Sequence, residues 1–396
     1  MRSGMKMNSA SWLLAATIGL TTISIQAQEK PAVEFSGSGF LTLAAGKILG
    51  GTRDNADTNP NYLGYKGPHF ISDWAQGAVY ENKGVQLAPD SRLGLQGSAI
   101  FSPNFSLTGQ VVARGARDGK VDLEWLYGSY KVNNNLTLQI GRKRLPILYY
   151  SESQDVGVSY PWVHLPTDLY GWQVVNYNGA NLMYRDQIEN WSYTATAFAG
   201  AETNKDSGYQ KMYNGKHSKT NVRWTNILGG ELALSRDWFE TRIGYFQNDA
   251  ENGITGTSDY QAKYRQKIYT LGFVIDYGNW LIRNEYYVGD LSRVEEKDYA
   301  QIYAIGYRMG QWTPMLTYSN YQTRYKVGGP IYGYSHDGEE RHDTRSVSLR
   351  YDLGSSSALK LQYDDYRDYS GPTFHAGGTV ATGNARLITL SYDKVF

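Results

Sequence analysis

Apolar and polar residues alternate along most of the chain after Glu34. The stretches RLGLQGSAIF (92–101), LTLQIGR (136–142), IYTLGFVIDY (268–277) and ARLITLSYDKVF (385–396) place an apolar or aromatic residue at nearly every second position. Alternation with a period of two is typical of β-strands whose two faces meet different environments. The pattern therefore predicts an all-β protein.

The connections between these stretches also follow a pattern. Short polar turns stand at 102–104, 133–135, 187–190, 236–237, 278–279, 310–311 and 354–357. Longer polar connections stand at roughly 45–90, 115–120, 144–178, 201–225, 249–264, 291–298, 325–341 and 369–384. Short and long connections alternate strictly, which in an up-and-down antiparallel sheet puts all the short turns on one side. Seven turns and eight loops separate sixteen predicted strands of about nine to twelve residues, a length suited to crossing a membrane at a tilt.

Four tryptophans lie at or just beyond the ends of short turns: Trp191, Trp238, Trp280 and Trp312. An indole combines an apolar ring with a polar N–H, so tryptophans at one height are typical of a membrane interface. In a soluble β-sandwich the same residues would be exposed at strand ends, which disfavours that alternative. We predict a transmembrane antiparallel up-and-down β-barrel of sixteen strands, with short periplasmic turns and long extracellular loops.

The amino terminus predicts export. Arg2 and Lys6 precede the apolar run WLLAATIGLTTISI (12–25), which is too short to span a bilayer, and Ala27 stands at a plausible cleavage point. We expect residues 1–27 to be a signal peptide and residues 28–396 to form the barrel. A mean hydropathy of −0.51 and the lack of an internal apolar run argue against a helical membrane protein. The net charge of +1 does not favour nucleic acid as a partner, and the absence of cysteine excludes disulfides and thiolate metal sites.

One segment carries a more specific resemblance. The stretch GRKRLPILYYSESQDVGVSYPWVHLPTDLYG (141–171), the short-turn and long-loop rhythm and the terminal Phe396 resemble Gram-negative outer-membrane porins. The resemblance implies a homotrimer in which the third long connection folds into the barrel. Lys394 departs from the family pattern, which usually has an aromatic or apolar residue two positions before the final phenylalanine.

The sequence offers little for catalysis. The motifs H-E-x-x-H, G-x-S-x-G and G-x-x-x-x-G-K-S/T are absent, and the six histidines are scattered through long loops or at their edges. Asp54, Asn55 and Asp57 could supply oxygen ligands, but their spacing is not that of a dedicated calcium loop. We therefore predict no catalytic residue, metal or cofactor.

A barrel of this size is too wide for side chains to fill, so it predicts a water channel whose narrowest part sets its selectivity. The long connection 144–178 is the expected constriction loop, with Glu152, Asp155 and Asp168 as its acidic candidates. Alternation turns the following charged residues inward: Arg92, Arg114, Glu124, Lys143, Arg242, Arg283, Glu285, Arg308, Arg350, Lys360 and Asp364. The predicted pore residues are Arg92, Arg114, Lys143, Glu152, Asp155, Asp168, Arg283, Arg308 and Arg350.

Two interpretations of these charges stay open. A basic wall facing an acidic loop would create a transverse field and a weak preference for anions. Alternatively, each arginine only keeps the wall hydrated or ties the loop to it. In the loop, the prolines and aromatics of YPWVHLPTDLYGW (160–172) predict a brace rather than a binding site, and His164 has no clear assignment.

The predicted function is passive diffusion of small hydrophilic solutes across an outer membrane rich in lipid and lipopolysaccharide. The first alternative is a substrate-selective channel for phosphate, sugar acids or oligosaccharides, for which Tyr149, Tyr150, Tyr160 and Trp162 offer aromatic surfaces. The second is a barrel without transport function that acts as an adhesin or receptor through its loops.

Overall fold

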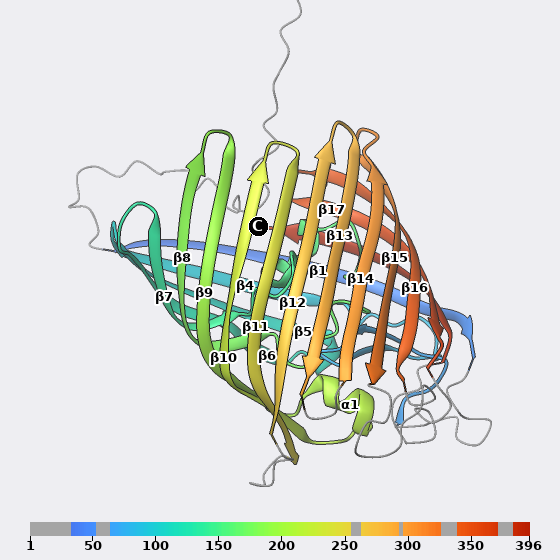
Figure 1. Cartoon of the computed structure of the whole chain (residues 1–396). Helices are drawn as coiled ribbons and strands as arrows, with labels where there is room; N and C mark the ends of the chain where they lie inside the picture. The colour runs from blue at the N-terminus through green and yellow to red at the C-terminus, as the bar shows by residue number, and fades with distance from the viewer. Residues whose placement is uncertain (1–32, 53–63, 255–262, 293–295, 326–338, 371–382) are drawn as a thin grey trace, which may run out of the picture.

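The computed structural model describes residues 33–52, 64–254, 263–292, 296–325, 339–370 and 383–396. The predicted signal peptide and the oxygen-rich stretch 53–59 lie outside these ranges. Sixteen strands form one closed antiparallel barrel, in which each strand pairs with its neighbours in sequence and β1 pairs with β18 and β4 (Figure 1). The barrel strands are β1 (Glu34–Gly51), β4 (Arg92–Ser102), β5 (Phe105–Arg114), β6 (Val121–Lys131), β7 (Leu136–Arg144), β8 (Asn176–Ile188), β9 (Trp191–Asn204), β10 (Thr220–Arg236), β11 (Phe239–Ile254), β12 (Tyr264–Tyr277), β13 (Trp280–Leu291), β14 (Glu296–Tyr307), β15 (Trp312–Tyr325), β16 (Arg341–Gly354), β17 (Ser357–Asp368) and β18 (Ala385–Val395).

The sixteen-strand prediction and the alternation of short and long connections are confirmed. All seven short turns lie at one end of the barrel, and those that join β8 to β9 and β10 to β11 stand at the top of Figure 1. Several strands are longer than the predicted nine to twelve residues: β1 has 18, β10 has 17 and β11 has 16. The added residues lie mostly at the loop end, where the backbone ladder of β10 and β11 continues to Thr220 and Ile254.

The outer face of the barrel carries the apolar half of the alternation. Leu93, Leu95 and Phe101 on β4 are 43, 51 and 45 % exposed, as expected for side chains that face lipid. Three of the four turn-side tryptophans, Trp238, Trp280 and Trp312, are about half exposed. Each packs its ring against a neighbouring aromatic, for example Trp280 against Tyr307 with centroids 4.9 Å apart. The structure thus places an aromatic belt around the short-turn end.

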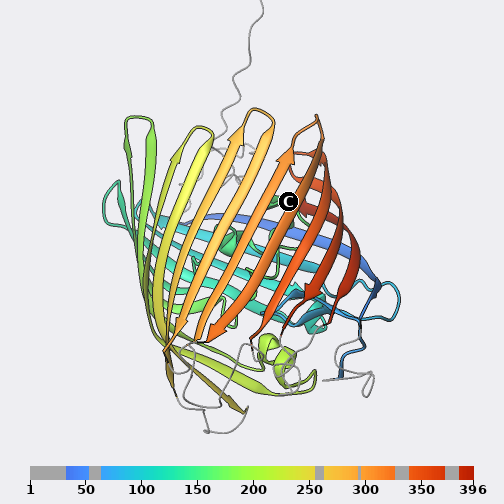
Figure 2. The ribbon, with the colours of Figure 1, turned by 45° about the vertical axis from the view of Figure 1, so that its right-hand side comes forward.

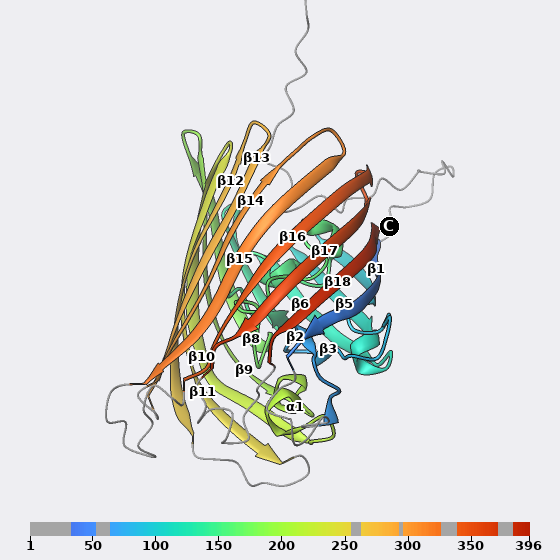
Figure 3. The ribbon, with the colours of Figure 1, turned by 90° about the vertical axis from the view of Figure 1, so that its right-hand side faces the viewer.

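The barrel closes between the two ends of the chain, where β1 and β18 lie side by side (Figure 3). Gly39 donates its N–H to the carbonyl of Phe396 at 2.6 Å, and Phe396 N donates back to Gly39 at 2.9 Å. A Cβ on Gly39 would stand 2.5 Å from the Phe396 ring, so glycine lets this ring lie close to β1.

Two small elements at the loop end were not predicted. The hairpin β2 (Phe70–Asp73) and β3 (Ala78–Tyr80) lies within the first long connection, and the helix α1 (Gly208–Asn214) lies between β9 and β10 (Figure 2). They pack together through Trp74, whose ring lies 5.5 Å from that of Tyr209 and 5.9 Å from that of Tyr213. None of the described helices has the length and apolar character needed to cross a membrane.

Candidate functional site: the inner loop and the lumen wall

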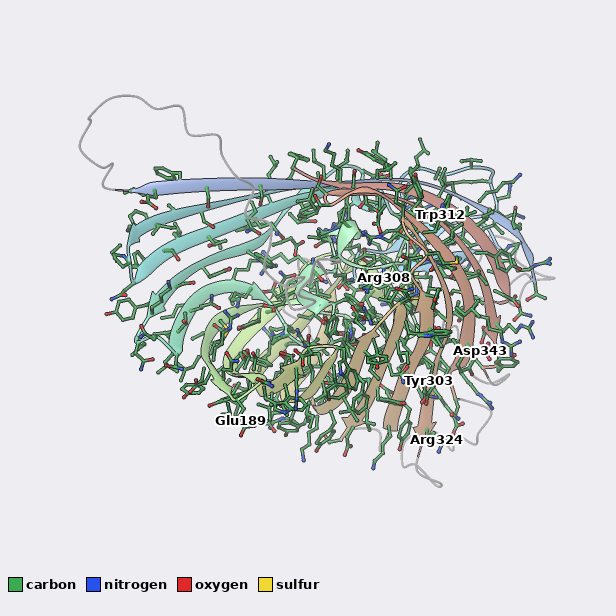
Figure 4. The ribbon with its side chains drawn as sticks, turned by 90° about the horizontal axis from the view of Figure 1, so that it is seen from above. Glu189, Tyr303, Arg308, Trp312, Arg324 and Asp343 are labelled. Carbon is green, nitrogen blue, oxygen red and sulfur yellow. The ribbon has the colours of Figure 1, made fainter. Side chains whose placement is uncertain are left out.

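The connection between β7 and β8, residues 145–175, is called the inner loop below. Seen along the barrel, its ribbon lies inside the ring of strands (Figure 4). It contains two 3-10 turns, Ser151–Ser153 and Gly157–Ser159. Most of its side chains are buried against lumen-facing residues of the wall. Part of its backbone is paired within the loop, for example Val156 N with the carbonyl of Ser153 at 2.8 Å, and side chains of the wall supply further partners.

Asp155 is the centre of the first anchor of the inner loop. Its carboxylate accepts hydrogen bonds from Arg114 on β5 at 3.2 and 2.8 Å and from Arg144 at the end of β7. Glu124 on β6 also pairs with Arg114, at 2.7 Å, and with Arg144, at 3.3 Å. Arg92 on β4 donates to the backbone carbonyl of Asp155 at 2.8 Å. Burial alone would raise the pKa of Asp155, but the three guanidinium groups hold it well below its usual range.

His164 is the second anchor. Its ring lies between Asp90, 3.1 Å from Nδ1, and Asp364 on β17, 3.3 Å from Nε2. Burial alone would lower the pKa of His164, but the two carboxylates raise it to about 10, so the ring is protonated at neutral pH. The adjacent Val163 donates its N–H to Gln362 at 2.7 Å. His164 thus acts as a cationic clamp between the inner loop and the wall.

The third anchor joins wall cations to backbone carbonyls of the inner loop. Lys360 on β17 donates to the carbonyls of Gly157 at 2.5 Å and Trp162 at 2.7 Å, and it pairs with Asp393 on β18 at 3.0 Å. Arg350 on β16 donates to the carbonyls of Val158 and Tyr160 at 2.7 and 3.0 Å. At Gly157 the wall is so close that a Cβ would stand 1.9 Å from an oxygen of Asp393. Only glycine allows this approach.

The aromatic residues of the inner loop form its core. Trp162 and Tyr160 are each 1 % exposed, and the Trp162 indole donates to Thr317 on β15 at 2.8 Å. Tyr150 packs edge-on against Trp162, with ring centroids 5.7 Å apart, and accepts a hydrogen bond from Arg283 on β13 at 3.0 Å. These contacts fix the aromatic core of the inner loop to the wall.

Asp168 lies in a polar cluster that brings a serine, a histidine and an aspartate together. Its carboxylate accepts a hydrogen bond from Ser319 on β15 at 2.5 Å and contacts the Nδ1 of His342 on β16. A hydrolytic triad requires the serine to donate to the histidine, whereas here the hydroxyl donates to the carboxylate. All three residues are at least 95 % buried. The cluster fits an anchor and lacks the nucleophile–base contact of an acyl-transfer site.

Other charged groups in the lumen keep some contact with solvent. Glu152 has the most exposed carboxylate of the inner-loop acids, with 49 % of its side chain accessible, and lies 3.8 Å from Lys143. Arg242 on β11 pairs with Glu240 at 2.9 Å and Glu231 at 3.7 Å.

Near the short turns, Asp276 on β12 contacts Arg283 at 2.6 Å and Arg308 at 3.0 Å. These pairs, together with Lys143 and Glu152, line the arc from β7 to β14.

The structure thus divides the predicted pore residues into two groups. Arg92, Arg114 and Asp155 meet in one anchor, Arg350 and Asp168 lie in two others, and all five are occupied by contacts between the loop and the wall. Of the other four, Glu152 and Arg308 keep 49 and 40 % of their side chains accessible and Lys143 keeps 11 %. Arg283 is also 11 % accessible and contacts the inner loop through Tyr150.

Sequence reasoning missed several charged residues of the lumen: Arg144, Glu231, Glu240, Asp276 and Asp393. Four of the five are acids, so the excess of bases on which the anion preference was based is smaller in the structure. Glu240 was detectable, because it stands two residues before the inward-facing Arg242 on β11. Arg144 was not, because simple alternation turns it outward.

Comparison with solved structures shows the fold. The outer-membrane channel DcaP of Acinetobacter baumannii superposes with a TM-score of 0.57 and 9 % identity, covering 93 % of this chain and 99 % of that one. An anion-selective porin from Comamonas acidovorans superposes with a TM-score of 0.55 and 13 % identity, covering 92 % of this chain and 100 % of that one. A loop-deletion mutant of OmpT, an outer-membrane protein of Vibrio cholerae, superposes with a TM-score of 0.57 and 12 % identity, covering 92 % of this chain and 100 % of that one. No protein-family model and no curated protein matches the sequence. The chain therefore has the sixteen-stranded barrel fold of outer-membrane porins.

Proposed function

We propose that this protein is an outer-membrane channel through which small hydrophilic solutes diffuse past a fixed inner loop. The observation that carries the proposal is the division of the lumen charges into two arcs. Hydrogen bonds and ion pairs fix the inner loop mainly to β4, β5, β13 and β15–β17. On the other arc the Glu152 side chain stays 49 % accessible, and those of Lys143 and Arg242 stay 11 and 13 % accessible. A path along that arc would be lined by charges of both signs.

Charge selectivity is expected to be weak. The bases of the open arc stand next to acids, as Arg242 does with Glu231 and Glu240, and Arg308 with Asp276. Paired charges largely cancel beyond about one Debye length, ~8–10 Å at physiological salt. We therefore expect the anion preference predicted from alternation to be slight, and the reversal potential in a salt gradient to lie close to zero. A clear preference for cations or for anions would contradict this assignment.

Single-channel recording in a planar bilayer tests the proposal. We expect discrete, stable conductance steps that no single solute blocks at low concentration. Block by micromolar phosphate, sugar acid or oligosaccharide would favour a substrate-selective channel instead. A folded barrel that gives no steps would favour a role as an adhesin or receptor.

The assembly state is a further part of the proposal. One of the superposing structures is described as the trimer form of OmpT from Vibrio cholerae. We expect a homotrimer here too, with lipid and lipopolysaccharide around it. Migration on a denaturing gel with and without heating would show a trimer as a band that heating converts to monomer.

A further inference from the structure

A groove on the outside of the barrel carries an inference separate from the channel. Its volume is about 310 Å³, and it lies across β13–β16. Most of the side chains that line it alternate with lumen-facing residues and so face outward. They include the aromatics Tyr286, Tyr299 and Tyr318, the amides Gln301, Asn320 and Gln322, and the charged Arg324, Arg341 and Asp343. An outer wall that faces only hydrocarbon would not present this set of polar groups.

The groove lies at the height of the second membrane interface. Trp312 in the aromatic belt and Arg324 stand at opposite ends of β15, twelve residues apart. At a rise of about 3.3 Å per residue and a tilt of about 40°, this separation is ~30 Å along the membrane normal. The apolar band of such a barrel is about 25 Å tall, so the groove lies among the lipid headgroups at the loop end. Figure 4 shows Tyr303, Arg324 and Asp343 in the same sector of the barrel.

Aromatic rings hold the two groove arginines in place. The Arg324 guanidinium lies 5.3 Å from the centroid of the Tyr299 ring and donates to Gln322 at 3.3 Å. Arg341 lies 5.8 Å from the centroid of the Tyr369 ring. Both side chains are exposed, and a guanidinium held over a ring loses less freedom when it binds an anion.

The surrounding outer face is also rich in arginine. Arg345 and Arg367 stand beside Asp343 and Asp365 on β16 and β17. The outward residues at the loop ends of β4 and β6 are instead apolar, for example Leu93 and Val121. The polar sector is therefore local and does not encircle the barrel.

We infer that this groove binds the headgroup of a phosphorylated glycolipid of the outer leaflet. The guanidinium group of arginine can donate two parallel hydrogen bonds to phosphate oxygens. Side-chain amides can hydrogen-bond the hydroxyls of a sugar, and tyrosine rings can pack against its faces. The buried Oδ1 of Asp343 lies 3.9 Å from Arg345 Nε, makes no hydrogen bond and could accept one from a sugar hydroxyl or amide. Free phosphate would use the arginines only. Below the groove, Ile305, Leu316 and Val347 continue as an exposed apolar surface, which suits acyl chains.

Binding of purified lipid A to the full-length, detergent-purified and delipidated protein tests this inference. The probes are diphosphoryl lipid A, its dephosphorylated form and inorganic phosphate, with bound lipid counted by native mass spectrometry. We expect the diphosphoryl form to bind more tightly than the dephosphorylated form, and millimolar phosphate not to displace it. An arginine near a charged lipid surface contributes about a fivefold gain in affinity, so the double variant Arg324→Gln/Arg341→Gln should bind about 25-fold more weakly.

The matched control is Arg265→Gln on β12. Arg265 is also exposed on the outer face, but it pairs with Asp249 at 2.5 Å, so the variant should bind lipid A like the parent protein. An equal loss of lipid A affinity in the control and in the double variant would mean general attraction to the outer face and would contradict binding at the groove. Equal binding of the two lipid A forms, or displacement by millimolar phosphate, would overturn the headgroup assignment. The comparison of lipid forms needs only the parent protein and so decides the case even if the double variant fails to fold.

Discussion

Asp155→Asn and Glu152→Gln form a pair that separates anchoring from selectivity. Both changes remove one negative charge from the inner loop, from positions three residues apart. Asp155 is 5 % exposed and is held by Arg114 and Arg144, whereas half of the Glu152 side chain is accessible and its nearest cation, Lys143, is 3.8 Å away. The two variants should therefore behave differently, although their charge change is the same.

The magnitudes follow from burial. Removing one partner of a buried ion pair costs about 3–5 kcal/mol, because the remaining charges are left without compensation. At 1.4 kcal/mol per factor of ten, the docking equilibrium of the segment around Asp155 should fall by roughly a hundredfold or more. Exposed pairs such as that of Glu152 are worth at most about 1 kcal/mol, so its loss should leave docking unchanged.

Single-channel recording combined with reversal potentials provides the assay. Asp155→Asn should give noisy current with frequent sublevels, because the loop leaves the wall for part of the time. Glu152→Gln should give quiet steps and a small shift of the reversal potential toward anions. Quiet steps from both variants with equal selectivity shifts would refute the division into an anchored and an open arc.

Three further outcomes are expected. Trp162→Phe should lower the free energy of unfolding by about 0.5–1.5 kcal/mol through loss of the hydrogen bond to Thr317, and Trp162→Ala by about 3–5 kcal/mol, as measured by thermal unfolding in one detergent. Current noise should rise at both extremes of pH. The raised pKa of His164 stabilises docking of the inner loop to the wall, fully below about pH 6.5, and this stabilisation is lost as pH rises through about 10. The lowered pKa of Asp155 stabilises docking of the loop above about pH 4, and this stabilisation is lost in stronger acid. Noise that stays flat up to pH 11 would contradict the assignment of His164. Trp280→Ala should reduce stability in vesicles by about 0.5–1.5 kcal/mol without changing conductance, since its ring packs against Tyr307 on the outer face.

Alternation correctly predicted which way most wall side chains point, because the face of a strand on which a side chain lies is a local property of the sequence. Arg114, Glu124, Arg350 and Lys360 all face inward as expected. Alternation failed at Arg144. The pairing between β6 and β7 ends at Arg142, and beyond this point the chain turns into the barrel. Alternation also cannot name partners. Asp155 and Arg114 meet across 41 positions of sequence, and only the path of the inner loop brings them together.

The backbone carbonyls of the inner loop require hydrogen-bond donors, which explains why basic residues are frequent in this lumen. A segment that crosses a barrel without joining its ladder leaves backbone carbonyls that must find donors. Arg92, Arg350 and Lys360 each donate to such carbonyls. Arginine and lysine suit this task because they donate several hydrogen bonds and accept none. A count of inward bases therefore overstates the positive field that a solute meets, because part of that charge is directed into the loop. For the proposed channel, we expect a solute to meet mainly the accessible charges of the open arc, where acids pair with bases, and we expect these charges to determine the selectivity.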